Sequence, residues 1–122
     1  MQITLLKSKL HQASVTSARP DYSGSLSIDQ NLMEAAGILH HEKILVGNIT
    51  NGERFETYCI PADHGSGEIG LNGAAAHKGK TGDLLVIMTF INLNPEEAAV
   101  WEPRLVLVSN SNLNHELIKS PQ

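Results

Sequence analysis

The apolar segments of this sequence are short, and glycine, asparagine and proline are frequent between them after residue 19. The longest apolar run, Leu84 to Ile91, has eight residues with Thr89 inside it, whereas a bilayer span needs ~20. Asn51-Gly52 is the strongest turn signal, because both residues tolerate a positive φ and a strand-like segment lies on either side. The pattern predicts a mainly β domain with short helices, either a small closed β-barrel or a sandwich. Closure is favoured because the run Leu84 to Ile91 needs cover on both faces.

Strand-like segments are expected where aliphatic and β-branched residues gather between turn residues. Pro61 is expected to end the strand before it. From Asn110 the chain is polar and contains Pro121, and we expect this tail to be mobile. The expected strands are 3–11, 13–17, 43–49, 54–60, 83–91 and, as the last strand, 104–109.

Two short helices have recognisable start signals. Asp29 is a candidate N-cap for a helix over 30–36, which glycine at Gly37 should end. Asn94 followed by Pro95 and two acidic residues is typical of a second helix start, because proline suits the first helical position.

Length and charge exclude several classes of function. The 122 residues leave room for a single domain, 1–122, since domains have ~100–200 residues. The net charge of -4 gives no basic stripe, which argues against a nucleic-acid partner. Lys7 and Lys9 interrupt an N-terminus without a cleavage site for secretion, and Cys59 is the single cysteine. We therefore expect a soluble, cytoplasmic protein without a membrane partner. A chain this small has little room for a deep pocket, so a site shared between subunits is attractive.

Two glycine-rich segments have nearly the spacing of phosphate-binding loops. Gly65 to Gly70 matches the dinucleotide fingerprint, but Leu71-Asn72-Gly73 follows where a long helix is required. Gly73 to Thr81 has one residue too many between its glycines for a P-loop. We predict a glycine-rich loop and a turn with exposed lysines, and a nucleotide-binding module is the least favoured function.

The histidines do not predict a metal site. No pair has the spacing that places two imidazoles on one helical face, and no second histidine follows His41-Glu42 at the required position. His11 differs from the others only because it shares a strand face with Lys9. Cys59 lies in an apolar strand and is expected to be a buried, inert thiol. The histidines expected at the surface are His40, His41 and His115.

The pair Gly24-Ser25 is typical of a turn when taken alone. Glycine before serine also permits a strained backbone in which the serine hydroxyl attacks the preceding carbonyl. The peptide bond then becomes an ester, and elimination of the ester leaves a dehydroalanine. This hydrolyses to a pyruvoyl group with loss of ammonia, so such a chain makes its own carbonyl cofactor.

From about Met1 to Arg104, without evident insertions, the sequence resembles the pyruvoyl-dependent aspartate 1-decarboxylase family. The specific matches occur in the family's order and are hard to reach by chance. They are Lys9-Leu10-His11, Tyr22-Ser23-Gly24-Ser25, Ile28-Asp29-Gln30, Ala35-Ala36-Gly37-Ile38, Asn51 to Tyr58, Leu71 to His77 and Gly82-Asp83.

The resemblance implies a six-stranded double-psi β-barrel and a homotetramer with active sites between subunits. It implies autocatalytic cleavage between Gly24 and Ser25 into a β chain (1–24) and an α chain (25–122). The pyruvoyl group from Ser25, with neither a metal nor pyridoxal phosphate, would form a Schiff base with L-aspartate and act as the electron sink. The products would be CO2 and β-alanine, which serves pantothenate and coenzyme A synthesis. The sequence leaves open whether a maturation factor assists.

The resemblance also implies roles for individual residues. Thr57 matches the residue that polarises the Gly24 carbonyl during self-cleavage and later lies against substrate. Tyr58 matches the proton donor, since a phenol can act as a general acid. Lys9 and Arg54 match cations that face the substrate carboxylates, and a guanidinium suits a bidentate grip on the β-carboxylate. The segment that lines the pocket matches Asn72, Gly73, Ala74 and Ala75, with His11 and Tyr22 as neighbours.

Some positions depart from the family or admit a plainer interpretation. Gly47 stands where some relatives carry a large aromatic residue, which puts the pocket shape there in doubt, and the tail after Arg104 resembles nothing strongly. Without the resemblance, Arg54 fits a solvated charge beside a hairpin and Tyr58 a residue of the barrel wall. The runner-up function is an unprocessed, catalytically silent barrel that binds a small carboxylic acid.

Overall fold

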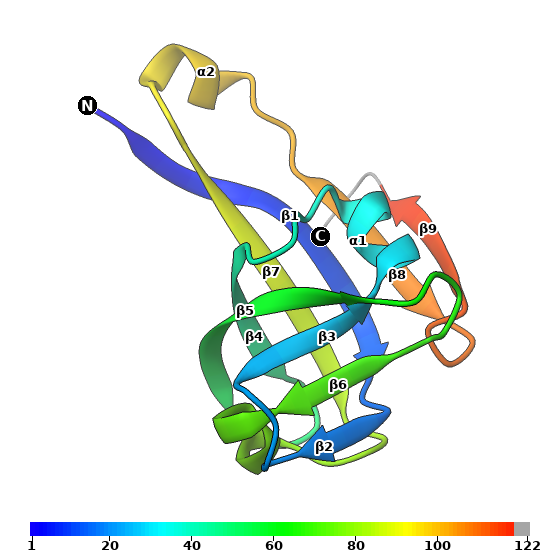
Figure 1. Cartoon of the computed structure of the whole chain (residues 1–122). Coiled ribbons are helices and arrows are strands. Elements are labelled where there is room, and N and C mark those ends of the chain that lie inside the picture. The colour runs from blue at the N-terminus through cyan, green and yellow to red at the C-terminus, as the bar shows by residue number, and fades with distance from the viewer. Residues whose placement is uncertain (119–122) are drawn as a thin grey trace.

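The structure, a computed structural model, describes residues 1–118 and consists mainly of β-strands (Figure 1). Pro121 therefore lies outside the described residues. No helix within 1–118 is long and apolar enough to cross a membrane. The elements are β1 (Ile3–Ser14), β2 (Ser17–Arg19), β3 (Ser25–Asp29), α1 (Gln30–Ala36), β4 (Lys43–Asn48), β5 (Arg54–Ala62), β6 (Ile69–Asn72), the 3-10 helix η1 (Gly73–Lys78), β7 (Leu84–Leu93), α2 (Pro95–Ala99), β8 (Arg104–Ser109) and β9 (Asn114–Ile118).

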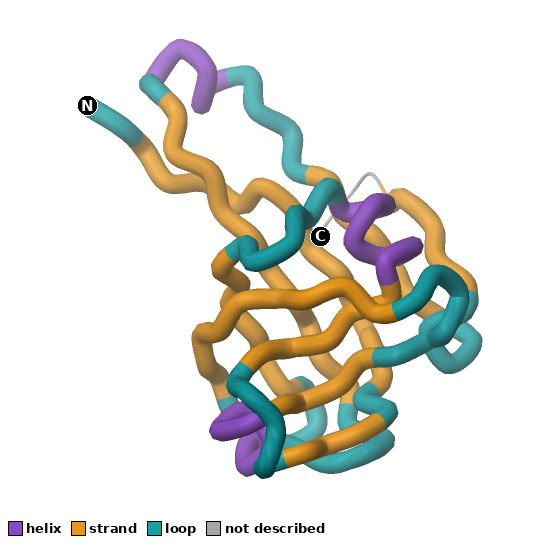
Figure 2. The backbone as a smooth tube through the Cα atoms, in the orientation of Figure 1, coloured by secondary structure: helices purple, strands orange, loops and turns teal. Residues whose placement is uncertain are grey.

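The strands pair in one continuous order, β2-β6-β3-β5-β4-β7-β1-β8-β9. Figure 1 shows β3, β5 and β6 crossing in front of β4, β7 and β1, and the short helices and loops lie around the strands (Figure 2). The mainly β prediction with short helices is thus confirmed. Over residues 1–118 the order has two ends, β2 and β9, and the predicted closed six-stranded barrel is not confirmed by it.

An aliphatic core fills the space between the crossing strands. Leu10, Ile28, Val46, Leu71 and Ile87 are all fully buried, and they come from five different strands. Each belongs to the face of its strand that points inward, because successive side chains of a strand point to opposite faces. The core therefore fixes which residues of each strand remain available on the outer face.

The apolar run in β7 was expected to be covered on both faces, and this expectation was wrong. Leu84 and Phe90 are 37% and 43% exposed, while Leu85 and Ile87 are fully buried. The strand alternates between the core and the outer face instead of being buried on both faces. Aliphatic composition alone did not distinguish these two arrangements.

The predicted helix and hairpin signals are confirmed. The Asp29 side chain accepts a hydrogen bond from the backbone N–H of Asn31, and Gly37 ends α1 with a φ of 71°. Asn94 and Glu97 form a reciprocal capping box at the start of α2. The strands β4 and β5 pair in antiparallel register on either side of Asn51-Gly52. These signals are local, so they do not depend on the rest of the fold.

Three boundaries differ from the prediction. The segments 3–11 and 13–17 were expected to be separate, but β1 runs from Ile3 to Ser14 through an irregularity at Gln12, whose φ is 67°. β5 was expected to end at Pro61 but continues to Ala62. The pairing of β5 with β4 has already ended at Tyr58, so at Pro61 only β3 pairs with β5. β8 is not the last strand, because Asn114–Ile118 pairs with it as β9. The part of the expected mobile tail that is described thus includes a strand.

Three buried or partly buried strands were not predicted at all. β2 and β6 pair in parallel, and β3 pairs with both β5 and β6. Each is three to five residues long, and serine or glycine interrupts the apolar pattern that would mark a strand. Their existence depends on pairing with distant segments, which local propensity does not encode.

Asn48 and Asp83 form a buried polar junction below the sheet. Asn48 Nδ2 donates to Asp83 Oδ2 over 2.9 Å and to the Lys78 carbonyl over 3.1 Å. The Lys80 N–H donates to the same Asp83 oxygen over 3.0 Å. The hydrogen bond from Asn48 is the main cause that lowers the pKa of Asp83, and burial opposes it. The junction ties η1 to the start of β7.

A pH titration of stability should reveal this junction. The pKa of Asp83 in the folded chain is below its ordinary value of 3.8. The contribution of Asp83 to the free energy of unfolding is therefore complete above pH 3.8 and is lost as the pH falls through the folded pKa. Asp83→Asn should be less stable than the wild type at pH 7, and its free energy of unfolding should change less on acidification below about pH 4. Urea unfolding across this range measures both; parallel curves for the two proteins would contradict the assignment.

Candidate active site

Strand pairing places Ser25 and Asn72 opposite each other at the ends of β3 and β6. Both are almost completely buried, at 2% and 1% exposure. Asn72 Nδ2 donates a hydrogen bond to Ser25 Oγ over 3.0 Å. The Ser25 hydroxyl is therefore buried and held by Asn72, in the residue that directly follows Gly24.

The backbone of Gly73 lies directly against Gly24. Gly73 has a φ of 65°, and a Cβ built on it would lie 2.6 Å from Gly24 Cα and 2.8 Å from Gly24 N. Only glycine meets both demands, the left-handed backbone and the close approach. The sequence analysis expected the strained backbone at Gly24, but Gly24 is not among the residues with positive φ. The positive φ belongs to its neighbour Gly73.

A cavity of about 150 Å³ is lined by Gly24. Thr57 faces it from β5, and Ala74 and Ala75 face it from η1. Continuing the parallel register of Leu26 with Cys59 by two residues brings Gly24 beside Thr57. Sequence reasoning missed other lining residues, for which no motif gave a signal; they are Phe55, Glu56 and Lys78.

The predicted cations and the predicted proton donor lie elsewhere, on the outer face of the sheet. Arg54 and Tyr58 are exposed on β5, and the structure places Lys9 and His11 on β1, half-buried. β7 and β4 lie between these two strands. His11, Val86, Gly47 and Arg54 form one cross-strand row. None of the four predicted residues lines the cavity beside Gly24, so one chain does not bring all of the predicted site together.

His11 is the unusual member of this outer group. Its Nδ1 is buried without a hydrogen-bond partner. Burial, followed by the charge of Lys9, lowers the pKa of His11. The imidazole thus favours the neutral form, in which it can accept as well as donate a proton.

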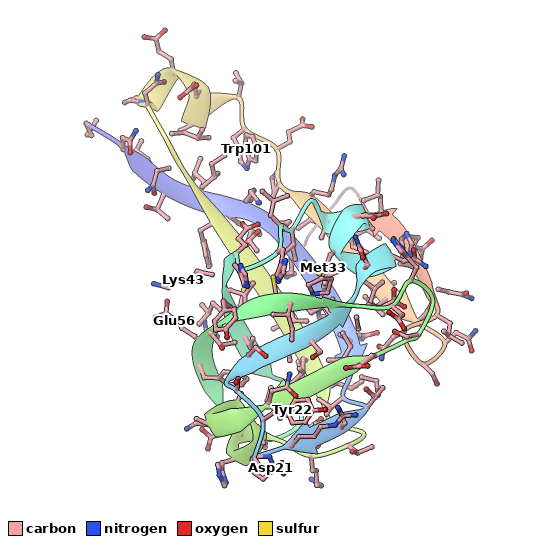
Figure 3. All side chains as sticks on the ribbon, in the orientation of Figure 1. Asp21, Tyr22, Met33, Lys43, Glu56 and Trp101 are labelled. Carbon is pink, nitrogen blue, oxygen red and sulfur yellow. The ribbon has the colours of Figure 1, made fainter. Side chains whose placement is uncertain are left out.

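The two tyrosines have different surroundings. Tyr58 is 38% exposed, and its ring meets the ring of His41 edge-on at 5.8 Å between centroids. Tyr22 is 52% exposed, and the Arg19 guanidinium lies 4.9 Å from its ring centroid. The Tyr22 carbonyl also lies 3.0 Å from the position of a Cβ on Gly73. Tyr22 therefore lies beside Gly73 and Gly24, and Figure 3 shows it near β6 and η1.

Gly47 lies close to side chains of the two neighbouring strands. A Cβ built there would lie 3.0 Å from Val86 Cγ1 and 3.9 Å from an Arg54 guanidinium nitrogen. A larger residue at this position would therefore crowd Val86 and approach Arg54.

The remaining candidate motifs are structural. The N–H groups of Gly65 and Gly67 donate to the Asp29 carboxylate, at 3.1 and 2.8 Å, so they are not free to cradle a phosphate. Gly73–Lys78 forms η1 instead of a turn, and Lys78 pairs with Glu53 at 3.2 Å. Within 1–118, no three histidine, cysteine or acidic side chains are grouped to hold a metal ion. The predicted surface histidines are confirmed as exposed; they are His40, His41 and His115.

Cys59 is confirmed as a buried thiol. Its exposure is 0%, and its Sγ donates to the Leu39 carbonyl over 3.2 Å. Burial, with a smaller contribution from the Glu42 carboxylate, raises the pKa of Cys59 to about 11. The thiol is therefore protonated at neutral pH and is a poor nucleophile.

The fold and the site define a small, mainly β protein with a serine hydroxyl held at a buried strand end, directly after a glycine that lines a cavity. The family model described as aspartate decarboxylase matches residues 1–115. An aspartate 1-decarboxylase of Campylobacter jejuni is 53% identical over 112 residues, covering 92% of this chain and 88% of that protein. One of Bordetella avium is 47% identical over 121 residues, covering 99% of each. This chain belongs to the aspartate decarboxylase family.

Replacing Gly73 by alanine should disturb Gly24 directly. An alanine at positive φ costs about 1–2 kcal/mol, and the collision with the Gly24 backbone should add ~1–3 kcal/mol. Gly37→Ala is the matched control, because Gly37 has a φ of 71° but no atom within 4 Å of an added Cβ. Urea unfolding of both variants, in a Ser25→Ala background that keeps the chain whole, measures the difference. Equal losses of stability would show that the contact with Gly24 has no consequence.

Proposed function

We propose that this chain cleaves itself between Gly24 and Ser25 and then decarboxylates L-aspartate to β-alanine, a precursor for pantothenate and coenzyme A synthesis. The observation that carries the proposal is the buried Ser25 hydroxyl, which accepts a hydrogen bond from Asn72. The family membership and the relatives' names, aspartate 1-decarboxylase, agree with it. The single domain 1–122 would then work as a β chain of residues 1–24 and an α chain of residues 25–122.

Self-cleavage places negative charge on the Gly24 carbonyl oxygen, and a hydrogen-bond donor is needed to stabilise that charge. Thr57 lines the same cavity as Gly24 and offers a hydroxyl donor to that oxygen. Ser25 Oγ attacks the Gly24 carbonyl carbon, the C–N bond breaks, and the hydroxyl proton passes to the amide nitrogen. The result is an ester between the two residues and a free amine on Ser25.

The ester then breaks by elimination. A base removes the Ser25 Cα proton, the Cβ–Oγ bond breaks, and its electron pair leaves with Oγ as the Gly24 carboxylate. Water adds to the tautomer of the resulting dehydroalanine and ammonia leaves, which gives the pyruvoyl group. The residues fit this group, since Ser25 lies at a buried strand end and the preceding Gly24 lines the cavity.

The pyruvoyl group supplies an electron sink for the pair released when the α-carboxylate leaves as CO2. Arg54 is suited to hold the β-carboxylate, because its guanidinium grips a carboxylate through two parallel hydrogen bonds. Lys9 adds a point charge, and Tyr58 donates a proton to the α-carbon. Asn72, Gly73, Ala74 and Ala75 bound the substrate position beside Ser25.

A single copy does not suffice for this site. Gly24, Thr57, Ala74 and Ala75 line the cavity. Lys9, His11, Arg54 and Tyr58 do not line it and lie on the outer face of the sheet. One aspartate would have to contact both sets of residues at once. We therefore assign the outer group of one copy to the Gly24 cavity of another, in a homotetramer of six-stranded double-psi barrels in which further strands extend each barrel.

Two substitutions separate cofactor formation from turnover. Ser25→Ala should abolish both cleavage and β-alanine formation, whereas Ser23→Ala, the same change at an exposed neighbour, should preserve both. Tyr58→Phe should cleave normally but lose about 10²-fold or more in kcat, because it removes the proton donor. Mass spectrometry of the chains and β-alanine release from L-aspartate give the two readouts. Normal turnover by Tyr58→Phe would show that another group donates the proton.

A further inference from the structure

We propose that Ser27 is a positioning residue for self-cleavage, because its hydroxyl orients the Asn72 amide that donates to Ser25 Oγ. This inference rests on the proposed function and adds a residue to it. Ser27 does not touch the Gly24-Ser25 bond in this arrangement. It acts on that bond only through Asn72.

The three side chains form one buried hydrogen-bonded chain. Asn72 Nδ2 donates to Ser27 Oγ over 2.8 Å and to Ser25 Oγ over 3.0 Å. Exposure is 6% for Ser27, 1% for Asn72 and 2% for Ser25. Water therefore does not compete for these groups, and each depends on the others for its hydrogen bonds.

The strand geometry explains why Ser27 can reach Asn72. Ser25 and Ser27 are two residues apart on β3, so their side chains share a face. Ser27 pairs with Gly70 across the sheet, and a Cβ on Gly70 would lie 3.4 Å from Ser27 Cβ. Asn72 comes from two residues further along β6 than Gly70, so its side chain shares that face of the strand and reaches Ser27 Oγ.

The two hydrogens on Asn72 Nδ2 have one partner each. With both donated, the amide plane is fixed at two points, and the hydrogen bond to Ser25 cannot swing away. Removing the Ser27 hydroxyl would leave one buried N–H without a partner, which is costly. The amide would then rotate toward another acceptor, and the hydrogen bond to Ser25 Oγ would lengthen or break.

The hydrogen bond from Asn72 matters most when Ser25 Oγ gains negative charge. This happens in the elimination step, in which the Ser25 Cα proton goes to a base and the Cβ–Oγ electron pair leaves on Oγ as the Gly24 carboxylate. A donor already aimed at Oγ stabilises that charge without reorganisation. Ser27 therefore contributes to the rate of pyruvoyl formation by keeping Asn72 in place beforehand.

The test measures the rate at which freshly synthesised chains cleave, by intact mass under denaturing conditions. Ser27→Ala should slow cleavage about ten-fold or more, which corresponds to ~1.4 kcal/mol of transition-state stabilisation. Ser27→Thr and Ser27→Val form a matched pair, since they have the same shape and only threonine keeps the hydroxyl. We expect Ser27→Thr to cleave at least several-fold faster than Ser27→Val. Equal rates in this pair would overturn the proposal even if Ser27→Ala folds poorly.

A double-mutant cycle separates a positioning role from a merely structural one. If Ser27 acts through Asn72, then Ser27→Ala should slow cleavage in the wild-type background but have little further effect in an Asn72→Ala background. Equal slowing in both backgrounds would contradict the inference. If the proposed function is wrong, the wild-type chain itself stays whole. If the wild-type chain cleaves and Ser27→Ala cleaves at the same rate, only the inference about Ser27 is overturned.

Discussion

The burial of strand β3 between β5 and β6 is the constraint on which the rest of this structure depends. All five of its residues are buried, and it pairs in parallel with β5 and in antiparallel register with β6. Leu26 and Ile28 point into the aliphatic core, so Ser25 and Ser27 must point to the other face. A serine hydroxyl in such a place needs a partner, and Asn72 at the end of β6 provides one.

The approach of Gly73 to Gly24 and the division of the predicted site follow from the same pairing. β6 ends opposite Ser25, so the next residue, Gly73, meets Gly24 without room for a side chain. Thr57 lines the cavity from β5, whereas Arg54 and Tyr58 on the same strand are exposed and do not line it. A chain folded in this way presents the Gly24-Ser25 pair and, separately, a set of ionisable groups. In the function proposed above, two copies bring both sets to one aspartate.

The sequence predicted those parts of the fold that depend on neighbouring residues. The hairpin at Asn51-Gly52 and the helix between Asp29 and Gly37 are set by φ preferences and capping. Pairing between distant segments was not predicted, and β3 and β6 were missed for this reason. The residues of the candidate site were named from the resemblance to a family. The resemblance did not predict that β4 and β7 lie between the strands that carry Lys9 and Arg54. Ser27 carried no motif, since its role depends on register.

Intact mass under denaturing conditions tests the central claim most directly, because self-cleavage makes the cofactor on which the proposed chemistry depends. The account predicts two species from the purified protein, residues 1–24 and residues 25–122. The larger should be lighter by one ammonia than the same fragment headed by serine. A single uncut chain in a sample that forms no β-alanine from L-aspartate would contradict the account and favour a silent barrel that binds a small acid.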